Sequence, residues 1–229
     1  MGSNYRLNYG VDLVFCIDAT GSMDHILDTV KQNALNFYDD FKEVMEEKKK
    51  HVSQLRIRVI AFRDYLEDQD KAMLLTDFFT LPDEAEAFRS RIQCIEAEGG
   101  GDDPEDGLEA IAYAIKNSKW SFSSEKRRHV IVVWSDEGTH PLGYGSSSPY
   151  YPSNIAKDFD ELTAWWGTKT APGIMDENAK RLVMFTPNKP GWSTIRANWN
   201  KALMCESEAG SGLDKLNYET ILDIISNTI

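Results

Sequence analysis

The chain has 229 residues, of which 41% are hydrophobic, and a formal net charge of -12. This length allows one large α/β domain or two small ones, with a core that needs no disulfides. The negative surface would repel phosphate backbones, which disfavours nucleic acid as a partner, and no apolar run approaches the roughly 20 residues of a membrane span.

The cysteines are odd in number and share no metal-binding or redox spacing. We therefore expect Cys16, Cys94 and Cys205 to be free, buried thiols in a reducing compartment, which predicts a cytoplasmic location. No secretory leader opens the sequence. Residues 1–9 are predicted to be a tail, in which Gly2-Ser3 could be a cloning remnant, and residues 10–229 a single domain.

The first predicted strand is the apolar run 11–17, and it leads into an amphipathic helix predicted over 22–47. Residues 54–62 begin with alternating polar and apolar side chains and predict a second strand. A third strand is predicted over 72–79. Because the link 66–71 is short and charged, we expect these two strands to pair antiparallel.

A helix is predicted over 81–95, because Pro82 and two acids stand near its start. Another helix runs through 108–115. Residues 129–134 are apolar throughout and predict a central strand. The following segment, 139–153, contains three prolines and three tyrosines and is predicted to be a long loop, a kind of segment that is usually functional or mobile.

The last third of the chain predicts helices over 155–166, 192–201 and 218–228, a strand over 181–186 and a short edge strand over 202–205. Strands that alternate with helices predict an α/β fold of three layers. We expect a Rossmann-like, doubly wound, mostly parallel central sheet with one antiparallel edge strand and helices on both faces. The basic runs 48–50 and 126–128 are predicted to be solvated ends of helices or loops.

Three oxygen-bearing side chains alternate where the first predicted strand ends, namely Asp18, Thr20 and Ser22. In an extended loop they would point to the same side, next to the free N–H groups of a helix start. Such a set suits a hard divalent cation. Serine and threonine are also common helix caps, so this motif alone leaves both interpretations open.

Further acids stand at predicted carboxyl ends of strands, namely Asp64 and Asp136, and Asp102 precedes a helix that should start on the same rim. Ligands of doubly wound folds bind at this rim. Gathering several acids there costs free energy unless a cation lies between them. The three segments together therefore favour a metal site.

With these motifs the chain resembles the von Willebrand factor type A domain family, which includes the integrin I domain, over roughly residues 10–229. That family binds a divalent cation, usually Mg²⁺, at a metal-ion-dependent adhesion site. Its first motif, Asp-x-Ser/Thr-x-Ser, matches Asp18-Ala19-Thr20-Gly21-Ser22, and its last, an Asp that ends the central strand, matches Asp136. The resemblance implies the metal ligands Asp18, Thr20, Ser22, Asp102 and Asp136, with Mg²⁺ as the cation and Mn²⁺ or Ca²⁺ as alternatives.

The middle motif departs from the family pattern, which usually has Thr after a Gly-rich turn, because this chain has Gly99-Gly100-Gly101-Asp102. The Gly-Gly-Gly-Asp-x-Pro-Glu form, together with Arg63-Asp64, resembles a subgroup that includes domains attached to atypical kinases and some hemicentin-like extracellular proteins. Three acids around a doubly charged cation leave one formal negative charge. We therefore expect tighter cation binding and a weaker attraction for a partner's carboxylate.

These features predict a metal-dependent protein–protein interaction module without enzymatic activity, in an intracellular adapter or regulatory protein. The partner would be another protein that places an acidic side chain on the metal. The resemblance suggests a role beside kinases, ATPases or phosphatases in bacterial stress and conflict systems. The residues expected in the second shell of the metal or against the partner are Asp64, Asp103, Glu137, His140 and Tyr144.

Two other functions remain open. A metal-dependent phosphohydrolase would use Asp18 as its nucleophile, but phosphatases of that kind need a general acid two residues later, where this chain has Thr20. An extracellular adhesin is disfavoured by the expected free cysteines and by the lack of Asn-x-Ser/Thr sites.

Overall fold

The computed structural model describes residues 8–33, 35–99, 104–122, 124, 126–209 and 217–229. Its strands are β1 (Asn8–Asp18), β2 (His51–Phe62), β3 (Met73–Leu75), β4 (Phe79–Leu81), β5 (Lys126–Trp134), β6 (Lys180–Thr186) and β7 (Ala202–Glu206). Its α-helices are α1 (Asp24–Asn33), α2 (Phe37–Glu47), α3 (Ala85–Gln93), α4 (Gly107–Asn117), α5 (Phe159–Trp166), α6 (Trp192–Asn198) and α7 (Tyr218–Thr228). The seven strands form one sheet in the order β3-β2-β1-β5-β6-β7, and β4 also pairs with β2.

The sheet is mostly parallel, as predicted. β1 pairs in parallel with β2 and with β5, and the ladder continues in parallel through β6 and β7. The antiparallel edge beside β2 is shared by two short strands, β3 and β4. The strand predicted over 72–79 was therefore too long. β3 ends before Thr76, because the hydroxyl of Thr76 accepts a hydrogen bond from the backbone N–H of Val59 at 2.9 Å, in place of a backbone carbonyl.

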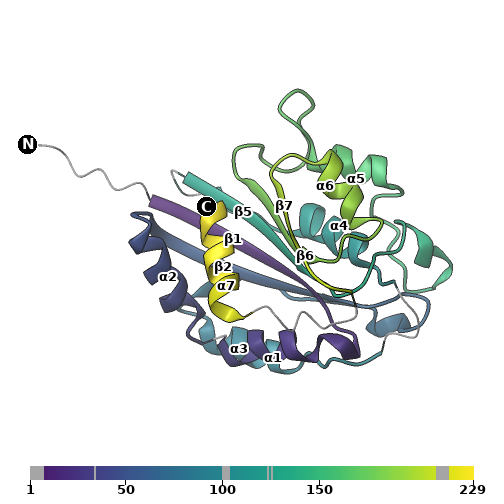
Figure 1. Cartoon of the computed structure of the whole chain (residues 1–229), viewed down its shortest axis with the longest axis horizontal. Coiled ribbons are helices and arrows are strands. Elements are labelled where there is room, and N and C mark those ends of the chain that lie inside the picture. The colour runs from purple at the N-terminus through teal and green to yellow at the C-terminus, as the bar shows by residue number, and fades with distance from the viewer. Residues whose placement is uncertain (1–7, 34, 100–103, 123, 125, 210–216) are drawn as a thin grey trace, which may run out of the picture.

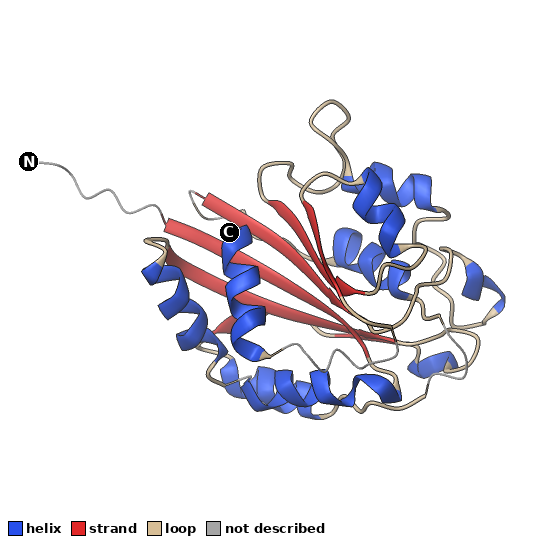
Figure 2. Ribbon diagram, viewed as in Figure 1, coloured by secondary structure: helices blue, strands red, loops and turns tan. Residues whose placement is uncertain are grey.

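Helices cover both faces of the sheet, which confirms the doubly wound, three-layer fold (Figures 1 and 2). α1, α2, α3 and α7 pack on one face, and α4, α5 and α6 pack on the other. Along β1 the side chains alternate between the two cores: Leu13 and Phe15 face the first, and Val14 and Cys16 face the second. Burial on both sides explains why the central strands are continuously apolar.

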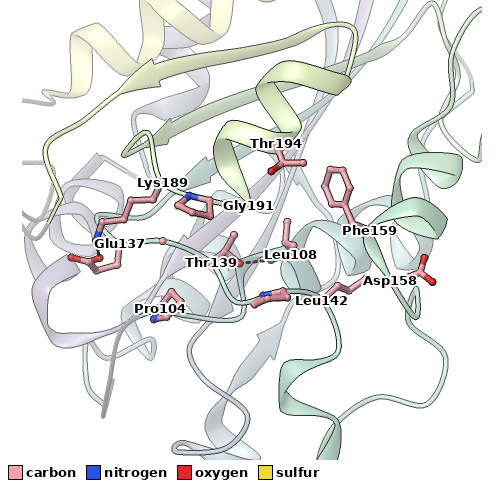
Figure 3. A pocket seen from close by; sticks show the side chains of 13 residues that line it. Pro104, Leu108, Glu137, Thr139, Leu142, Asp158, Phe159, Lys189, Gly191 and Thr194 are labelled. Atoms are coloured by element: carbon pink, nitrogen blue, oxygen red, sulfur yellow. Dashed lines mark hydrogen bonds and ion pairs between the residues drawn. The ribbon is translucent and has the colours of Figure 1, made fainter.

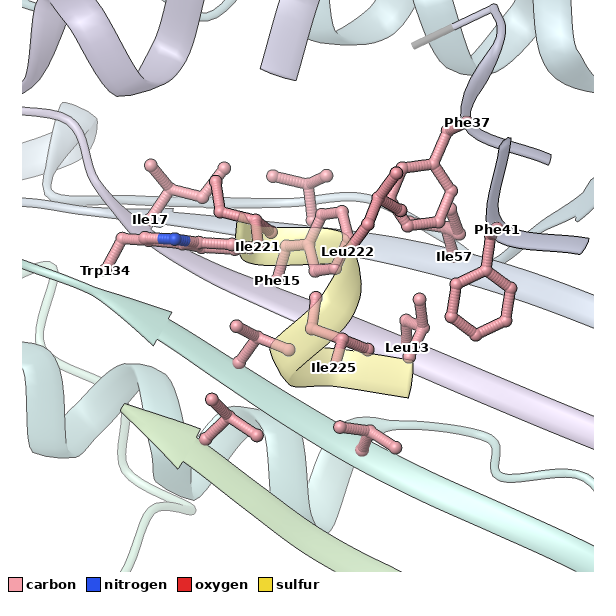
Figure 4. Close-up of a cluster of buried hydrophobic side chains, with 14 of the residues drawn as sticks. Leu13, Phe15, Ile17, Phe37, Phe41, Ile57, Trp134, Ile221, Leu222 and Ile225 are labelled. Atoms are coloured by element: carbon pink, nitrogen blue, oxygen red, sulfur yellow. The ribbon is translucent and has the colours of Figure 1, made fainter. Parts of the chain in front are cut away.

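The first core fixes the carboxyl halves of β1 and β5 relative to each other (Figure 4). The ring of Phe15 makes edge-to-face contacts with Trp134 at 5.0 Å and with Phe37 at 5.7 Å between centroids. Ile221 and Ile225 of α7 close this cluster from above the sheet. Aromatic packing of this kind holds the two strand ends in one arrangement.

Several predicted helices have different bounds: the one predicted over 155–166 begins only at Phe159, and the one predicted over 192–201 ends at Asn198. The helix predicted over 22–47 is divided into a short 3₁₀ turn, α1 and α2, with the break next to Asn33 and Asn36. Asparagine competes for backbone hydrogen bonds and favours turns, which explains the interruption. The helix predicted over 81–95 begins only at Ala85, because Leu81 is still part of the antiparallel edge.

The basic run 126–128 lies inside β5, so its prediction as a solvated end was wrong. Of its side chains, Arg127 pairs with Asp176 at 3.0 Å, and Arg128 binds the carboxyl end of α7 together with two basic residues from elsewhere in the chain. Arg128 Nε donates to the carbonyl of Ile229 and Arg181 Nε to that of Thr228, each at 3.0 Å, while Lys48 pairs with Asp223 at 2.7 Å. Cations at the carbonyl end of a helix are favourable, and here they dock α7 at the pole opposite the predicted site.

The predictions on the cysteines and on the N-terminal tail are partly wrong. The cysteines are all free, but only Cys16 is buried, while Cys94 is exposed and Cys205 is half-buried. The tail predicted over 1–9 overlaps β1, which begins at Asn8, and its earlier residues lie outside the described part of the chain. Within the described residues, no helix has the length and apolar character needed to cross a bilayer.

We expect replacement of Lys180 by methionine to lower the free energy of unfolding by about 2–4 kcal/mol. The side chain of Lys180 is completely buried; its ammonium donates to the carbonyls of Trp166 and Gly167 at 2.8 and 2.7 Å and pairs with Glu177 at 2.7 Å. Methionine would leave the last carbonyls of α5 without these donors. Urea unfolding at pH 7 measures the loss.

The matched control is Lys201→Met. Lys201 reaches the same Glu177 at 3.6 Å, but its side chain is 30% exposed, so its loss should cost no more than about 1 kcal/mol. Equal destabilisation by the two substitutions would contradict the role given to Lys180.

Candidate functional site

The candidate site lies where the order of strands reverses. The chain passes from β1 to β2 on one side, whereas β5, β6 and β7 follow one another on the other side. Asp18 is the last residue of β1, and Asp136 stands two residues beyond Trp134, where β5 ends. A crevice at such a switch point is the usual binding place in doubly wound folds.

Four of the predicted ligands are joined there by a chain of short contacts. The hydroxyl of Thr20 donates to Asp18 Oδ1 at 2.6 Å and lies 3.4 Å from the hydroxyl of Ser22. Ser22 in turn donates to Asp136 Oδ1 at 2.9 Å. The structure thus brings together Asp18, Thr20, Ser22 and Asp136 from the two neighbouring strand ends.

Burying the two carboxylates of this group close to each other is electrostatically unfavourable. Asp18 and Asp136 are both fully buried. The pKa of Asp18 is raised to about 6, mainly by burial and in part by the nearby charge of Asp136, while hydrogen bonds from Thr20 and Ser135 limit the rise. A positive ion between the two carboxylates would relieve the cost of burying like charges.

Ser135 is a site residue that the sequence did not single out. Its hydroxyl donates to Asp18 Oδ2 at 2.8 Å, so both carboxylate oxygens of Asp18 are oriented by hydroxyl donors. The sequence shows only that Ser135 stands next to Asp136 at a strand end. A single serine in such a place is common, so it does not indicate a site residue. Ser135 and Thr20 fix the direction of the Asp18 carboxylate.

The donor set fits a hard divalent cation, since it consists only of carboxylate and hydroxyl oxygens. Within the described segments no group of three or more His, Cys, Asp or Glu side chains is placed to hold a metal ion. The set here has only two acids, and its other members are hydroxyls. The predicted ligand Asp102 and the predicted neighbour Asp103 lie outside the described residues.

Asp64, expected in the second shell of the metal or against the partner, pairs with His140. Asp64 Oδ2 lies 2.8 Å from His140 Nε2, while Asp64 Oδ1 accepts from the backbone N–H of Leu66 at 2.5 Å. His140 is only 4% exposed and is covered by the ring of Tyr144, with 3.8 Å between ring centroids. His140 is therefore buried between Asp64 and the ring of Tyr144.

A buried glutamate of α4 holds the long loop that borders the site. Glu109 Oε1 accepts from the backbone N–H of Gly143 at 2.9 Å and from the hydroxyl of Tyr151 at 2.8 Å. Tyr151 is thereby engaged in packing the loop, whereas Tyr144 and Tyr150 are 48% and 51% exposed. The loop therefore presents two tyrosines from a fixed base.

Glu109 belongs to a group of buried acids behind the site, with Glu105 and Asp106. Burial raises the pKa of Glu105 to about 9, with further contributions from Asp18 and Asp64. Burial and the neighbouring Glu109 raise the pKa of Asp106 well above its usual range. These residues were missed as site residues, because a carboxylate on a helix or just before one is ordinarily solvent-exposed and nothing local marks it as buried.

Glu137, predicted to be in the second shell or against a partner, forms an ion pair with Lys189. Its backbone carbonyl accepts from the indole N–H of Trp192 at 2.9 Å. Lys189 lies in the connection after β6, far from Glu137 in the sequence, and was not singled out. The pair ties the loop after β5 to the loop after β6.

Residues 12–125 match the family model of the von Willebrand factor A domain. This match supports a von Willebrand factor A domain, the family that the motifs resemble. A sequence relative is the alpha-protein kinase vwkA of Dictyostelium discoideum, which is 28% identical over 147 residues. The aligned part is 64% of this chain and 21% of that kinase, so the chain spans only a small part of the kinase's length.

Two solved structures show a weaker likeness. The pilus adhesin SpaC from Lactobacillus rhamnosus GG is 12% identical with a TM-score of 0.49, and the match covers 95% of this chain and 30% of SpaC. Proximal thread matrix protein 1 from the mussel byssus is 12% identical with a TM-score of 0.44, covering 97% of this chain and 48% of that protein. The strand order of the chain itself defines its fold.

Proposed function

We propose that this chain, as a von Willebrand factor A-like domain, is a metal-dependent protein–protein interaction module. The contacts that join Asp18, Thr20, Ser22 and Asp136 at the switch point carry this proposal. In this proposal the four side chains hold a divalent cation, with Asp102 as a fifth ligand. Mg²⁺ is the favoured ion, because the donors are all hard oxygens, and Mn²⁺ or Ca²⁺ are alternatives.

The bound cation would offer an open coordination position to an acidic side chain of another protein. Tyr144 and Tyr150 supply exposed aromatic surface on the neighbouring loop, and tyrosine is favoured at protein interfaces. Because Glu109 fixes this loop, the surface would bind with little ordering cost. We further propose that the module serves a cytoplasmic adapter or regulatory protein.

The arrangement of Asp18 favours a binding role over hydrolysis. A phosphohydrolase that uses Asp18 as its nucleophile would also need a general acid two residues later. Position 20 is a threonine, whose hydroxyl donates to Asp18 Oδ1. The residue two positions later, Thr20, orients Asp18 and cannot act as a carboxylic general acid. An assay with Mg²⁺ and an aryl phosphate should therefore show no turnover above the level of an Asp18→Asn variant.

Affinity capture with the immobilised chain tests the interaction. We expect partner proteins to be retained in Mg²⁺, released by EDTA and lost on the Asp136→Ala variant. The matched control is Asp39→Ala. Asp39 is an exposed acid of α2 that is not part of the candidate site, so this variant should retain the same proteins. Retention that is indifferent both to EDTA and to Asp136→Ala would refute the metal-dependent mode.

A further inference from the structure

A buried arginine at the end of β2 joins three segments of the chain. Arg63 follows Phe62, the last residue of β2, and is only 6% exposed. Its Nε donates to the carbonyl of Ala19 at 3.0 Å. Its Nη1 and Nη2 donate to the carbonyls of Lys71 and Glu96, each at 2.7 Å. Every nitrogen of the guanidinium therefore binds a backbone oxygen, each from a different segment.

The bond to Ala19 places this arginine against the proposed metal ligands. Ala19 stands between Asp18 and Thr20, so its backbone connects two of them. The carbonyl of Ala19 also accepts from the backbone N–H of Glu98 at 3.0 Å. The loop that carries Asp18 and Thr20 is thus held in place by the guanidinium of Arg63 and by the segment that leads to the middle motif.

Arg63 also holds the chain on both sides of the middle motif. Glu96, whose carbonyl accepts from Nη2, lies just before the segment 99–102. Asp106 lies just after it, at the start of α4, and its backbone N–H donates to the carbonyl of Arg63 at 3.2 Å. One residue therefore connects the first motif to both described flanks of the segment that contains the predicted ligand Asp102.

The β5 side of the site is held by more exposed contacts. There a cavity of about 650 Å³ lies between the loops after β5 and β6 and the start of α4 (Figure 3). The Glu137–Lys189 ion pair lies at one end of it, and the hydroxyl of Thr139 accepts from the N–H of Leu108 at 3.2 Å (Figure 3). The side chain of Lys189 is 39% exposed, and exposed ion pairs contribute little. The buried Arg63 is therefore the stronger support of the rim.

We propose that Arg63 is a positioning residue of the metal site, which fixes Asp18 and Thr20 relative to the middle motif. This inference rests on the proposed function. A guanidinium suits the task, because its planar fork reaches three backbone acceptors at once, whereas the ammonium of lysine is a compact point charge. Replacing groups that orient metal ligands from outside typically lowers metal affinity by about 10–100-fold.

Arg63→Lys tests this role, because it keeps the positive charge and removes the planar fork. Isothermal titration calorimetry of the whole chain should show an affinity for Mg²⁺ about tenfold or more below that of the wild type. The gain in stability from EDTA to saturating Mg²⁺ should fall by about 1.4 kcal/mol for each factor of ten. Urea unfolding measures this gain, and it does so for a less stable variant as well.

Arg63→Met separates the position of the ligands from the charge near them. Removing a positive charge close to the site would by itself strengthen the binding of Mg²⁺. We expect the affinity of this variant to be lower than that of the wild type, because the loss of the three hydrogen bonds outweighs the change in charge. A higher affinity would overturn the positioning role.

Arg58→Lys is the matched control. Arg58 belongs to the same strand, is also 6% exposed, and donates to the carbonyls of Thr76 and Asn117 at 2.7 and 2.8 Å. Asn117 is the last residue of α4, at the end of that helix away from the candidate site. Arg58→Lys should therefore lose stability as Arg63→Lys does but keep the affinity of the wild type for Mg²⁺.

The outcomes separate this inference from the proposed function. Unchanged Mg²⁺ affinity in Arg63→Lys, or an equal loss of affinity in Arg58→Lys, would overturn the role of Arg63 and leave the proposed function standing. A wild-type chain that binds no Mg²⁺ would overturn the proposed function, and the positioning role with it.

Discussion

Replacing Asp18 by asparagine is expected to lower the affinity for Mg²⁺ by at least about a hundredfold. One charge less at a ligand of the cation removes on the order of 4 kcal/mol of attraction at an effective dielectric constant near 20. Isothermal titration calorimetry of wild type and variant measures the change. At 100 times its dissociation constant, Mg²⁺ should raise the stability of the wild type by about 2.7 kcal/mol, and the variant should lose this gain.

The same variant should be at least as stable as the wild type at pH 8 in EDTA. Burial raises the pKa of Asp18 to about 6, so its charge destabilises the metal-free protein above that pH. Asparagine keeps Oδ1 as the acceptor for Thr20, and its amide can donate to the hydroxyl of Ser135, which now donates to Asp18 Oδ2. The substitution therefore separates loss of metal from loss of fold.

In the control variant Asp12→Asn we expect the opposite result, a loss of stability without a loss of Mg²⁺ binding. Asp12 is also a buried aspartate of β1, but it accepts from Arg56 Nη2 at 2.6 Å and from Arg56 Nε at 2.7 Å. Breaking this pair should lower stability by about 3–5 kcal/mol with the Mg²⁺ response intact. Full Mg²⁺ affinity in Asp18→Asn, or an equal loss of stability with and without Mg²⁺, would contradict the assignment of Asp18 as a ligand.

The local pattern of the sequence was sufficient where an element is specified by its own residues. The apolar runs 11–17 and 129–134 predicted two strands, and both are found near the centre of the sheet. The amphipathic pattern also placed α7 over Tyr218–Thr228. In such segments the local structural preference and the hydrophobic pattern agree with the burial found in the fold.

Predictions failed where tertiary contacts decide the structure. The hydroxyl of Thr76 replaces a backbone acceptor on β2 and ends β3. The basic run 126–128 belongs to β5, where Arg128 donates to the carbonyl of Ile229 just after α7. Neither contact can be read from neighbouring residues, because each partner is distant in the sequence.

The residues of the candidate site also fall into those that the sequence indicates and those that it does not. Asp18, Thr20 and Ser22 form a short motif, and Asp136 ends a strand, so all four could be named in advance. Their supporting groups could not. Ser135 is a single serine, and Glu105, Asp106, Glu109 and Lys189 acquire a role only through folding. The stacking of Tyr144 over His140 likewise joins the loop residues only in the folded chain.

In EDTA we expect the stability of the protein to fall by on the order of 2–4 kcal/mol between pH 7 and pH 9. The cause is the group of buried acids next to the site. The pKa of Glu105 is raised to about 9 and that of Asp106 is also raised, in both cases mainly by burial. In the unfolded chain both groups lose their protons near pH 4. Above pH 4 the folded state therefore binds more protons than the unfolded state, and stability falls until the pH passes the folded pKa.

The choice of pH range limits the groups that contribute. Burial lowers the pKa of His129, so its contribution to stability rises with pH, but only up to about its ordinary value near 6.5. The pKa of Asp176 is lowered, and its contribution is confined to acidic pH. Burial also raises the pKa of Glu109 and of the Cys16 thiol, so both add to the decline, Cys16 only near and above pH 8.5. The share of Glu105 is therefore measured by its own substitution.

Glu105→Gln should flatten this pH dependence and, at pH 9, should be more stable than the wild type, because the amide keeps the shape of the side chain and removes the charge that must be desolvated. Glu86→Gln is the matched control: the side chain of Glu86 is 78% exposed, and its substitution should leave the slope unchanged. If the wild type shows no decline from pH 7 to pH 9, or if Glu105→Gln declines as steeply as Glu86→Gln, then Glu105 does not keep its proton in the folded protein. The rim would then carry an additional negative charge at neutral pH, and its affinity for a divalent cation should be correspondingly higher than three acids alone would give.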